Sequence, residues 1–239
     1  MAREQLPAVA FFDVDDTILK GPSIIMAAKY MLFEKGQAGA VSPSFLLDGL
    51  KALIDVRTGA VDYDTLVEKG LSQFVGHTLA ELEEVAQGAF DDYMRKNIYK
   101  LAYREIRKHQ KAGRKVILLT ASLTPIIQPL ADFLGADSVI ALNPIFENGR
   151  MTGRAEKPFC YEKGKLLLAR EYCLEHDIDL KDCYFYSDSS SDLPLMEKVG
   201  HPRPTCPDPA LRRIALLRNW RMHFFHSLLP PDFTPEHWK

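Results

Sequence analysis

The chain has 239 residues, 26% of them charged and 46% hydrophobic, and its formal net charge is −2. This length allows one large domain or a core with a smaller module, and the weak charge gives no electrostatic reason to expect nucleic acid as a partner. The four cysteines have no C-x-x-C spacing, which predicts reduced thiols and not a zinc site or a disulfide framework. The residues before the first predicted strand leave no room for a signal peptide, and no apolar stretch is long enough to span a membrane. We therefore expect a cytoplasmic protein.

The first predicted strand covers about residues 8–12 and is followed by acidic side chains. Asp13 and Asp15 come directly after the apolar run and point in the same direction if strand geometry continues through them. Two carboxylates this close repel each other, so the pair implies a bound cation, a shared proton or a charged reaction partner. An acidic turn that ends the strand is the alternative, and these residues alone leave both interpretations open.

Residues 23–96 have a helical pattern without a convincing strand. Helices are predicted from Ser23, from Ser42-Pro43, over residues 62–74, and from the capping-box pattern Thr78-Leu79-Ala80-Glu81 to about Lys96. This block is interpreted as a small helical module inserted after the first strand.

Strands and helices alternate in the rest of the chain. The predicted strands cover residues 115–119, 138–141 and 183–186, and the predicted helices cover residues 99–112, 125–133, 162–175 and a segment that opens at Asp192. Asn148-Gly149 is typical of a type I′ hairpin. Alternation of this kind predicts an α/β fold with a parallel sheet covered on both faces, in which reactive groups gather at the carboxyl ends of the strands.

Polar clusters follow three of the predicted strands, at residues 13–15, 120–122 and 187–192. Carboxylates collected with hydroxyl groups and a lysine suit Mg²⁺ and a phosphate group, because Mg²⁺ prefers oxygen ligands and binds substrate phosphates. An EF-hand does not explain the first cluster, because Ile18 and Ile24 occupy the positions that need glycine and glutamate.

Four short motifs follow one another along the chain. They are Asp13-Val14-Asp15-Asp16-Thr17, Leu118-Leu119-Thr120, Gly164-Lys165, and the segment Ser187–Pro194. In this order they resemble the motifs of the haloacid dehalogenase (HAD) superfamily of phosphohydrolases, and the helical insertion resembles the cap of its phosphoserine-phosphatase-like branch, subfamily IB. The resemblance implies a Rossmann-like parallel sheet core, the HAD fold, formed by residues 1–20 and 97–239, with an α-helical cap inserted at residues 21–96.

The resemblance assigns phosphoryl-transfer roles to the first two motifs. Asp13 resembles the nucleophile that forms an aspartyl phosphate, and Asp15 resembles the general acid and base. Thr17, two positions after Asp15, matches the threonine of the acid–x–acid–x–Thr pattern in the phosphatases of the family. Thr120 resembles the phosphate-binding hydroxyl, assisted by the backbone N–H of Ala121.

The third motif supplies a cation to the implied site. Lys165 resembles the lysine that neutralises charge on the nucleophile and on the transferring phosphoryl group, and it is also counted among the phosphate-binding residues. Lys163 is the alternative. Because the two lysines are two residues apart on a helix, their side chains cannot face the same way. Ser122 is either a phosphate contact or a turn residue.

The acidic residues are expected to hold Mg²⁺. Asp188 resembles a direct metal ligand, together with Asp13 and the carbonyl of Asp15. Asp192 resembles the further acidic residue that orients the metal site, and we expect it also to be the N-cap of the helix that follows.

The implied function is Mg²⁺-dependent hydrolysis of a small phosphorylated metabolite. Phosphoserine is disfavoured as the substrate, because the segment Ile18–Ser23 lacks the glutamate that holds the substrate's amine in phosphoserine phosphatases. An alternative of a different class is a catalytically weak HAD-fold protein that binds phosphate without turnover.

The segment Leu211–His226 contains four arginines and no acidic residue, interleaved with aromatic residues. Such a stretch can lie on an anionic membrane surface, where the enzyme would act on a lysophospholipid or another lipid phosphate. We favour a terminal helix that packs Ile214, Leu217 and Trp220 on the sheet, because amphipathic helices mostly face cores. Four further residues are expected to be solvated: His77, His109, His176 and His201.

Overall fold

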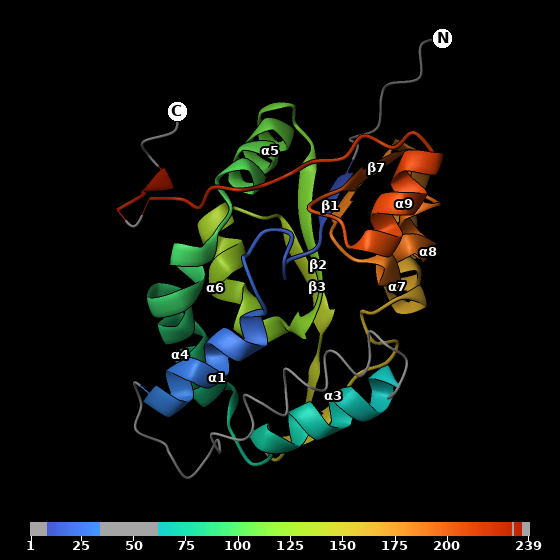
Figure 1. Cartoon of the computed structure of the whole chain (residues 1–239). Coiled ribbons are helices and arrows are strands. Elements are labelled where there is room, and N and C mark those ends of the chain that lie inside the picture. The colour runs from blue at the N-terminus through green and yellow to red at the C-terminus, as the bar shows by residue number, and fades with distance from the viewer. Residues whose placement is uncertain (1–8, 34–61, 231, 236–239) are drawn as a thin grey trace.

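The computed structural model describes residues 9–33, 62–230 and 232–235, except for the side chains of Leu66 and Gln73. The helix predicted from Ser42-Pro43 lies outside the described residues. Within them, helices cover both faces of a sheet, and further helices lie beyond the carboxyl ends of its strands (Figure 1). This architecture confirms the α/β fold class.

Five parallel strands form the sheet in the order β3-β2-β1-β6-β7. They are β1 (Val9–Phe12), β2 (Lys115–Leu123), β3 (Ser138–Leu142), β6 (Tyr184–Ser187) and β7 (His201–Pro204). Strand β1 is central, paired with β2 on one side and with β6 on the other. The residues that follow β1 and β6 are therefore brought together at one edge of the sheet.

The sequence pattern predicts no strand at His201–Pro204, and its two prolines explain why. Strand β7 lies at the edge of the sheet beside β6, with Phe185 opposite Pro202 and Ser187 opposite Pro204. An edge strand tolerates proline because one row of its backbone groups has no partner in the sheet.

Each face of the sheet has its own core. Along β1, Ala10 and Phe12 belong to one buried cluster and Val9 and Phe11 to the other, since side chains alternate along a strand. The first face is covered by α5 (Lys100–Lys111) and α6 (Thr124–Leu134), and the second by α7 (Lys163–Glu175), α8 (Leu193–Met196) and α9 (Pro209–Leu217). Short 3₁₀ turns, η4 (Leu180–Asp182) and η5 (Ser190–Asp192), lie on either side of β6.

The helical block comprises α1 (Ser23–Phe33), α3 (Tyr63–Leu71), η1 (Ser72–Phe74), α4 (Leu79–Ala89), the π-helical η2 (Phe90–Met94) and η3 (Arg95–Asn97). The capping box is confirmed, because the Thr78 N–H donates to Glu81 (2.8 Å) and the Glu81 N–H donates to the Thr78 hydroxyl (3.2 Å). The helix predicted to reach Lys96 is α-helical only to Ala89 and continues with π and 3₁₀ geometry. Apolar side chains of the block, such as Met31 and Leu82, join the core that α6 also lines.

A hairpin formed by β4 (Pro144–Glu147) and β5 (Arg150–Ala155) lies against the block. The type I′ turn is confirmed by positive φ angles at both central residues, 50° at Asn148 and 74° at Gly149. Backbone bonds join Met151 to His77 (2.8 Å) and to Gly76 (2.9 Å), so the hairpin is bound to the end of η1.

The C-terminal segment packs only in part as the sequence predicts, because Trp220 is half-buried against the core on the second face of the sheet, as expected. Helix α9 buries Leu211 and Ala215, whereas Leu217 is exposed. After α9 the chain crosses from the α9 side of the molecule to the α5 side (Figure 1), where the Lys100 N–H donates to the Ser227 carbonyl (2.8 Å). No helix among the described residues is long and apolar enough to cross a membrane.

His109 is buried, which contradicts the prediction that it is solvated. Its Nε2 lies 3.0 Å from the Tyr186 hydroxyl, and its Nδ1 has no hydrogen-bond partner in the described part of the chain. Burial, with a smaller contribution from the neighbouring Arg114, lowers the pKa of His109 to about 4. The folded protein therefore holds this ring neutral.

Acid is expected to destabilise the protein through His109. The unfolded imidazole takes up a proton near pH 6.5 and the folded one only near pH 4, so the contribution to stability is complete above pH 6.5 and is lost as the pH falls toward 4. We expect His109 to contribute about 3 kcal/mol to the loss of stability over this range, measured as the difference in pH dependence between the unchanged protein and His109→Gln, because Asp13 and Asp15 titrate in the same range in both proteins. Urea unfolding at both ends of the range measures this. The same pH dependence in the two proteins would refute it.

Candidate active site

Two carboxylates, those of Asp13 and Asp15, lie at the carboxyl edge of the sheet, directly after β1. The Asp13 N–H donates to the Tyr186 carbonyl (2.9 Å), which extends the pairing of β1 with β6 by one residue and buries Asp13. The Asp15 carboxylate accepts the backbone N–H of Ser23 (2.8 Å), at the start of α1. Asp16 has a positive φ of 58° and accepts the Gly21 N–H (3.0 Å), so it stabilises the loop.

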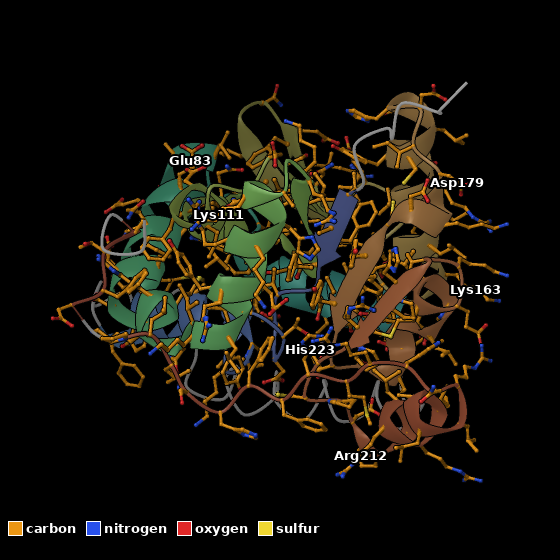
Figure 2. All side chains as sticks on the ribbon, turned by 90° about the horizontal axis from the view of Figure 1, so that it is seen from above. Glu83, Lys111, Lys163, Asp179, Arg212 and His223 are labelled. Atoms are coloured by element: carbon orange, nitrogen blue, oxygen red, sulfur yellow. The ribbon has the colours of Figure 1, made fainter. Side chains whose placement is uncertain are left out.

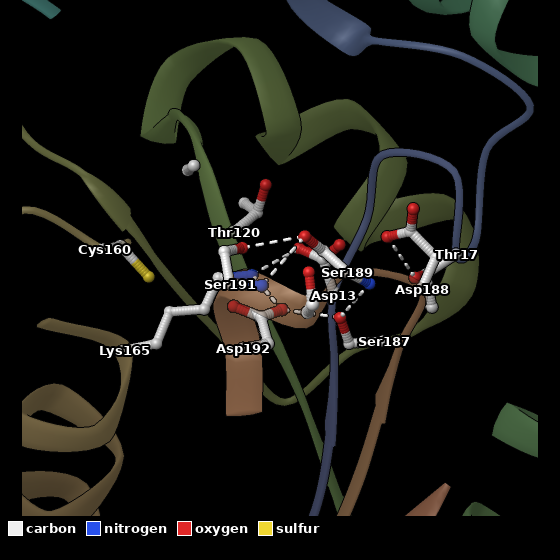
Figure 3. Close-up of polar contacts among 12 residues, drawn as sticks. Asp13, Thr17, Thr120, Cys160, Lys165, Ser187, Asp188, Ser189, Ser191 and Asp192 are labelled. Carbon is white, nitrogen blue, oxygen red and sulfur yellow. Dashed lines mark hydrogen bonds and ion pairs between the residues drawn. The ribbon is translucent and has the colours of Figure 1, made fainter. Parts of the chain in front are cut away.

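Lys165 is the cation of this cluster. It is buried on α7, and its Nζ donates to Asp13 Oδ1 (2.7 Å) and to Asp192 Oδ2 (2.8 Å) (Figure 3). Lys163 is exposed and lies at the outer rim of the molecule in Figure 2. The structure therefore brings Lys165, and not Lys163, to the carboxylates.

The start of α7 depends on Gly164. A Cβ atom at this position would lie 1.8 Å from the carbonyl oxygen of Phe159, so any larger residue would push the first turn of the helix away. This close approach is what allows Lys165 to reach Asp13.

Asp192 is buried and bound by two donors. Its Oδ2 accepts from Lys165 and from the Ser187 hydroxyl (2.6 Å), whereas its Oδ1 has no hydrogen-bond partner among the described residues. The predicted capping role is wrong: Asp192 occupies the N-cap position of α8, but its side chain makes no capping hydrogen bond. Its carboxylate is directed to Lys165 instead.

Asp188 follows β6 at the same edge and is buried. The Thr17 hydroxyl lies 3.5 Å from its Oδ1, so the first and fourth motifs meet here (Figure 3).

The second motif lies in β2 and does not follow it. The strand continues to Leu123, past the predicted end at Leu119, and its register with β3 shifts between these two residues. Thr120 is buried, and its Oγ1 accepts the N–H of Ser122 (3.2 Å).

Two residues of the helical block contact this motif. The Ser23 hydroxyl donates to the Ser122 hydroxyl (2.9 Å), and the Tyr63 hydroxyl donates to the Ala121 carbonyl (3.2 Å). The ring of Tyr63 also stacks on Tyr161, with centroids 3.9 Å apart. The block therefore reaches the site through α1 and through the first turn of α3.

Burial dominates the electrostatics of the site. It raises the pKa of Asp13 to about 7, a rise that Lys165 opposes and Asp192 reinforces, and it raises the pKa of Asp15 to about 6 against the hydrogen bond from Ser23. Burial alone would lower the pKa of Lys165, but Asp13 and Asp192 hold it well above its ordinary value. Lys165 is therefore a permanent ammonium group.

The donor atoms of the site fit a hard divalent cation. No three His, Cys, Asp or Glu side chains form a metal-binding group in the ranges that the structure describes. Asp13 and Asp188, with the carbonyl of Asp15, offer oxygen donors only, and Mg²⁺ usually takes one or two carboxylates and completes its shell with water and substrate oxygens. Asp13, Asp15 and Asp192 interact with one lysine, Lys165, and Asp188 is buried at the same edge of the sheet. This excess of negative charge favours a bound cation.

Asp208 is a site residue that the sequence analysis misses. Its carboxylate accepts the N–H of Ser190 (2.7 Å) and the N–H of Leu211 (2.8 Å), and its own N–H donates to the Asp188 carbonyl (2.8 Å). Asp208 thereby ties the loop after β6 to the N-terminus of α9. An aspartate directly before Pro209 is a helix-start signal and could have revealed the cap.

Replacing Asp208 by alanine is expected to loosen this connection. The N–H groups of Ser190 and Leu211 lose their acceptor, and loss of an N-cap costs about 1 to 2 kcal/mol. Asp208→Asn keeps an acceptor oxygen and is the matched control, expected within about 0.5 kcal/mol of the unchanged protein. Chemical unfolding measures both. Equal losses in the two variants would show that the capping bonds are not responsible.

The chain matches the model of a known protein family over most of its length. The family is described as haloacid dehalogenase-like hydrolase, and the match covers residues 10–197. The chain therefore belongs to this family of hydrolases. Its structure shares the fold of a phosphoserine phosphatase, the fold that its motifs predict.

Two relatives and two solved structures illustrate the likeness. The chain is 32% identical to the inhibition of morphological differentiation protein of Streptomyces azureus, over 91% of this chain and 78% of that protein. It is 30% identical to a probable phosphatase of Mycobacterium tuberculosis, over 88% and 73% of the two chains. Its structure resembles that of a Bordetella pertussis protein of unknown function (TM-score 0.81, 29% identity, 91% and 98% covered). It also resembles a substrate-bound phosphoserine phosphatase (TM-score 0.67, 17% identity, 91% and 100% covered).

Proposed function

We propose that the protein hydrolyses a phosphomonoester of a small metabolite through an aspartyl phosphate at Asp13. The observation that supports this most is the buried bridge of Lys165 between Asp13 and Asp192, which holds a cation against one carboxylate at the edge of the sheet. A lysine in this position neutralises a carboxylate that must approach an anionic phosphate. The probable phosphatase among the relatives supports the same activity.

The proposed reaction has two steps. In the first, a carboxylate oxygen of Asp13 attacks phosphorus, the bond to the alcohol oxygen breaks, and Asp15 gives its proton to the leaving alcohol. In the second, Asp15 takes a proton from a water molecule as its oxygen attacks phosphorus, which frees Asp13 and inorganic phosphate. The hydroxyl of Thr120 and the N–H of Ala121 are proposed to bind the phosphate oxygens, with Ser122 beside them.

Mg²⁺ is the proposed cofactor. Asp13, Asp188 and the carbonyl of Asp15 would hold it, and Asp192 would position Lys165 beside it and not bind the ion directly. Bound there, the ion would offset the repulsion between the carboxylates and the phosphate.

The helical block, residues 21–96, is proposed to be a cap over a core of residues 1–20 and 97–239. The contacts of Ser23 with Ser122 and of Tyr63 with Ala121 support this, because both lie on the phosphate-binding motif. A cap in this position would select the leaving group. Phosphoserine is not the proposed substrate, since the segment Ile18–Ser23 has no acid to hold an amine.

A phosphate-release screen tests the proposal. Purified protein with Mg²⁺ is expected to release phosphate from at least one compound in a panel of sugar phosphates, phosphoamino acids, histidinol phosphate and lysophosphatidate, and chelation should stop it. Binding of phosphate without release from any compound would instead support a binding protein with the same fold.

A further inference from the structure

Helix α9 and the segment after it expose apolar side chains to solvent. Leu216 is 64% exposed, Leu217 is 79% exposed and Phe224 is 42% exposed. We call this region the docking face and define it by seven residues: Arg212, Arg213, Leu216, Leu217, Arg218, Arg221 and Phe224. The helix is anchored to the core through Leu211 and Ala215, so the exposed leucines are not needed to hold it in place.

The docking face is strongly basic. The chain as a whole has a net charge of −2, yet it has no acidic residue between Asp208 and Asp232. The Asp208 carboxylate is occupied by the N–H groups of Ser190 and Leu211, and Glu197 of the neighbouring segment pairs with Arg218 (2.5 Å). Among the residues that the structure describes, no acidic side chain pairs with Arg212, Arg213 or Arg221, so their positive charge can be offered to an external partner.

The arginines lie among the apolar groups. The guanidinium of Arg212 lies 5.8 Å from the centre of the Phe224 ring, so α9 lies beside the part of the following segment that contains Phe224. The guanidinium of Arg218 lies 5.3 Å from the Trp220 ring. Positive charge and exposed apolar surface thus occupy the same patch.

We propose that the docking face binds the surface of an anionic phospholipid bilayer. The leucines and Phe224 would enter the boundary between headgroups and acyl chains, and the arginines would contact lipid phosphates. Helix α9 lies at the periphery of the molecule in both Figure 1 and Figure 2, where Arg212 points outward, so a flat surface can reach it. An acidic protein or RNA would satisfy the arginines, but a bilayer also removes both leucines from water.

Vesicle co-sedimentation tests this inference independently of the enzyme's substrate. The full chain is expected to bind vesicles of phosphatidylcholine with about one third phosphatidylglycerol and not vesicles of phosphatidylcholine alone, with binding weakened by salt. Arg213→Gln/Arg221→Gln should lower the affinity about 25-fold, from about fivefold for each arginine. Leu216→Ser/Leu217→Ser should lower it at least about tenfold.

Two double variants are matched controls. Leu167→Ser/Leu174→Ser changes leucines of α7 that are 48% and 81% exposed, and Lys111→Gln/Lys181→Gln removes two exposed charges elsewhere. Both controls should bind vesicles like the unchanged protein. Thermal unfolding of all the variants checks that they are folded.

Three results would overturn the proposal. The first is no binding to the anionic vesicles, and the second is an equal loss of vesicle binding in the control variants. The third is that single-stranded RNA binds as tightly as the vesicles while the leucine substitutions leave vesicle binding unchanged. The last would assign the face to polyanions in general.

Discussion

Asp13→Asn is expected to lower the turnover number for phosphate release by at least about a thousandfold, because an amide cannot replace a carboxylate as the nucleophile. The substitution keeps the size of the side chain and removes only its charge and its nucleophilic oxygen. The protein should remain folded, since the backbone bond from Asp13 to Tyr186 is unaffected. Single-turnover and steady-state phosphate release measure the loss.

Asp16→Asn is the matched control for this substitution. Asp16 lies in the same loop but turns away to accept the N–H of Gly21, and its φ of 58° suits asparagine as well as aspartate. Activity within about twofold of the unchanged protein is expected, because an amide oxygen can accept the same bond. If Asp13→Asn retained comparable activity, the proposed nucleophile would be wrong.

Lys165→Met is the second substitution with a large expected effect. It leaves the buried carboxylates of Asp13 and Asp192 without their shared ammonium group. We expect activity to fall at least about a hundredfold, as for the loss of one preorganised electrostatic contact. The free energy of unfolding should fall by about 3 kcal/mol, because removing one partner of a buried ion pair leaves uncompensated charge.

Lys163→Met separates the catalytic effect from a general effect of lysine loss on α7. Lys163 lies two positions before Lys165 on the same helix, but its side chain is exposed. Its replacement should therefore change the free energy of unfolding by less than about 0.5 kcal/mol and leave activity unchanged. Kinetics and urea unfolding of the two variants form one experiment. Equal losses at both positions would contradict the assignment of Lys165 to the site.

Much of the site could be predicted from the sequence because it depends on local spacing. The Asp13-x-Asp15 pair directly follows a recognisable strand, so its position at the carboxyl edge of the sheet depends only on neighbouring residues. The capping box at Thr78 and the turn at Asn148-Gly149 are equally local, and both are confirmed.

The predictions that the structure contradicts concern residues whose environment is set by contacts between distant segments. His109 has the polar character of a surface residue, but α5 places it against Tyr186 in the core. Leu217 belongs to an amphipathic pattern with more than one apolar side, and packing turns Leu211 and Ala215 inward. Asp192 matches an N-cap, yet a lysine 27 positions earlier takes its carboxylate.

The sequence by itself determined the fold class, the strand that bears Asp13 and Asp15, and the family, because strand periodicity and ordered motifs are properties of neighbouring residues. Only the tertiary structure decided that Lys165 and not Lys163 meets Asp13, 152 positions away, and that Tyr63 and Ser23 contact the second motif. Which of two neighbouring side chains enters a site depends on the direction in which a helix packs. That direction is set by the burial of its whole apolar face against the sheet.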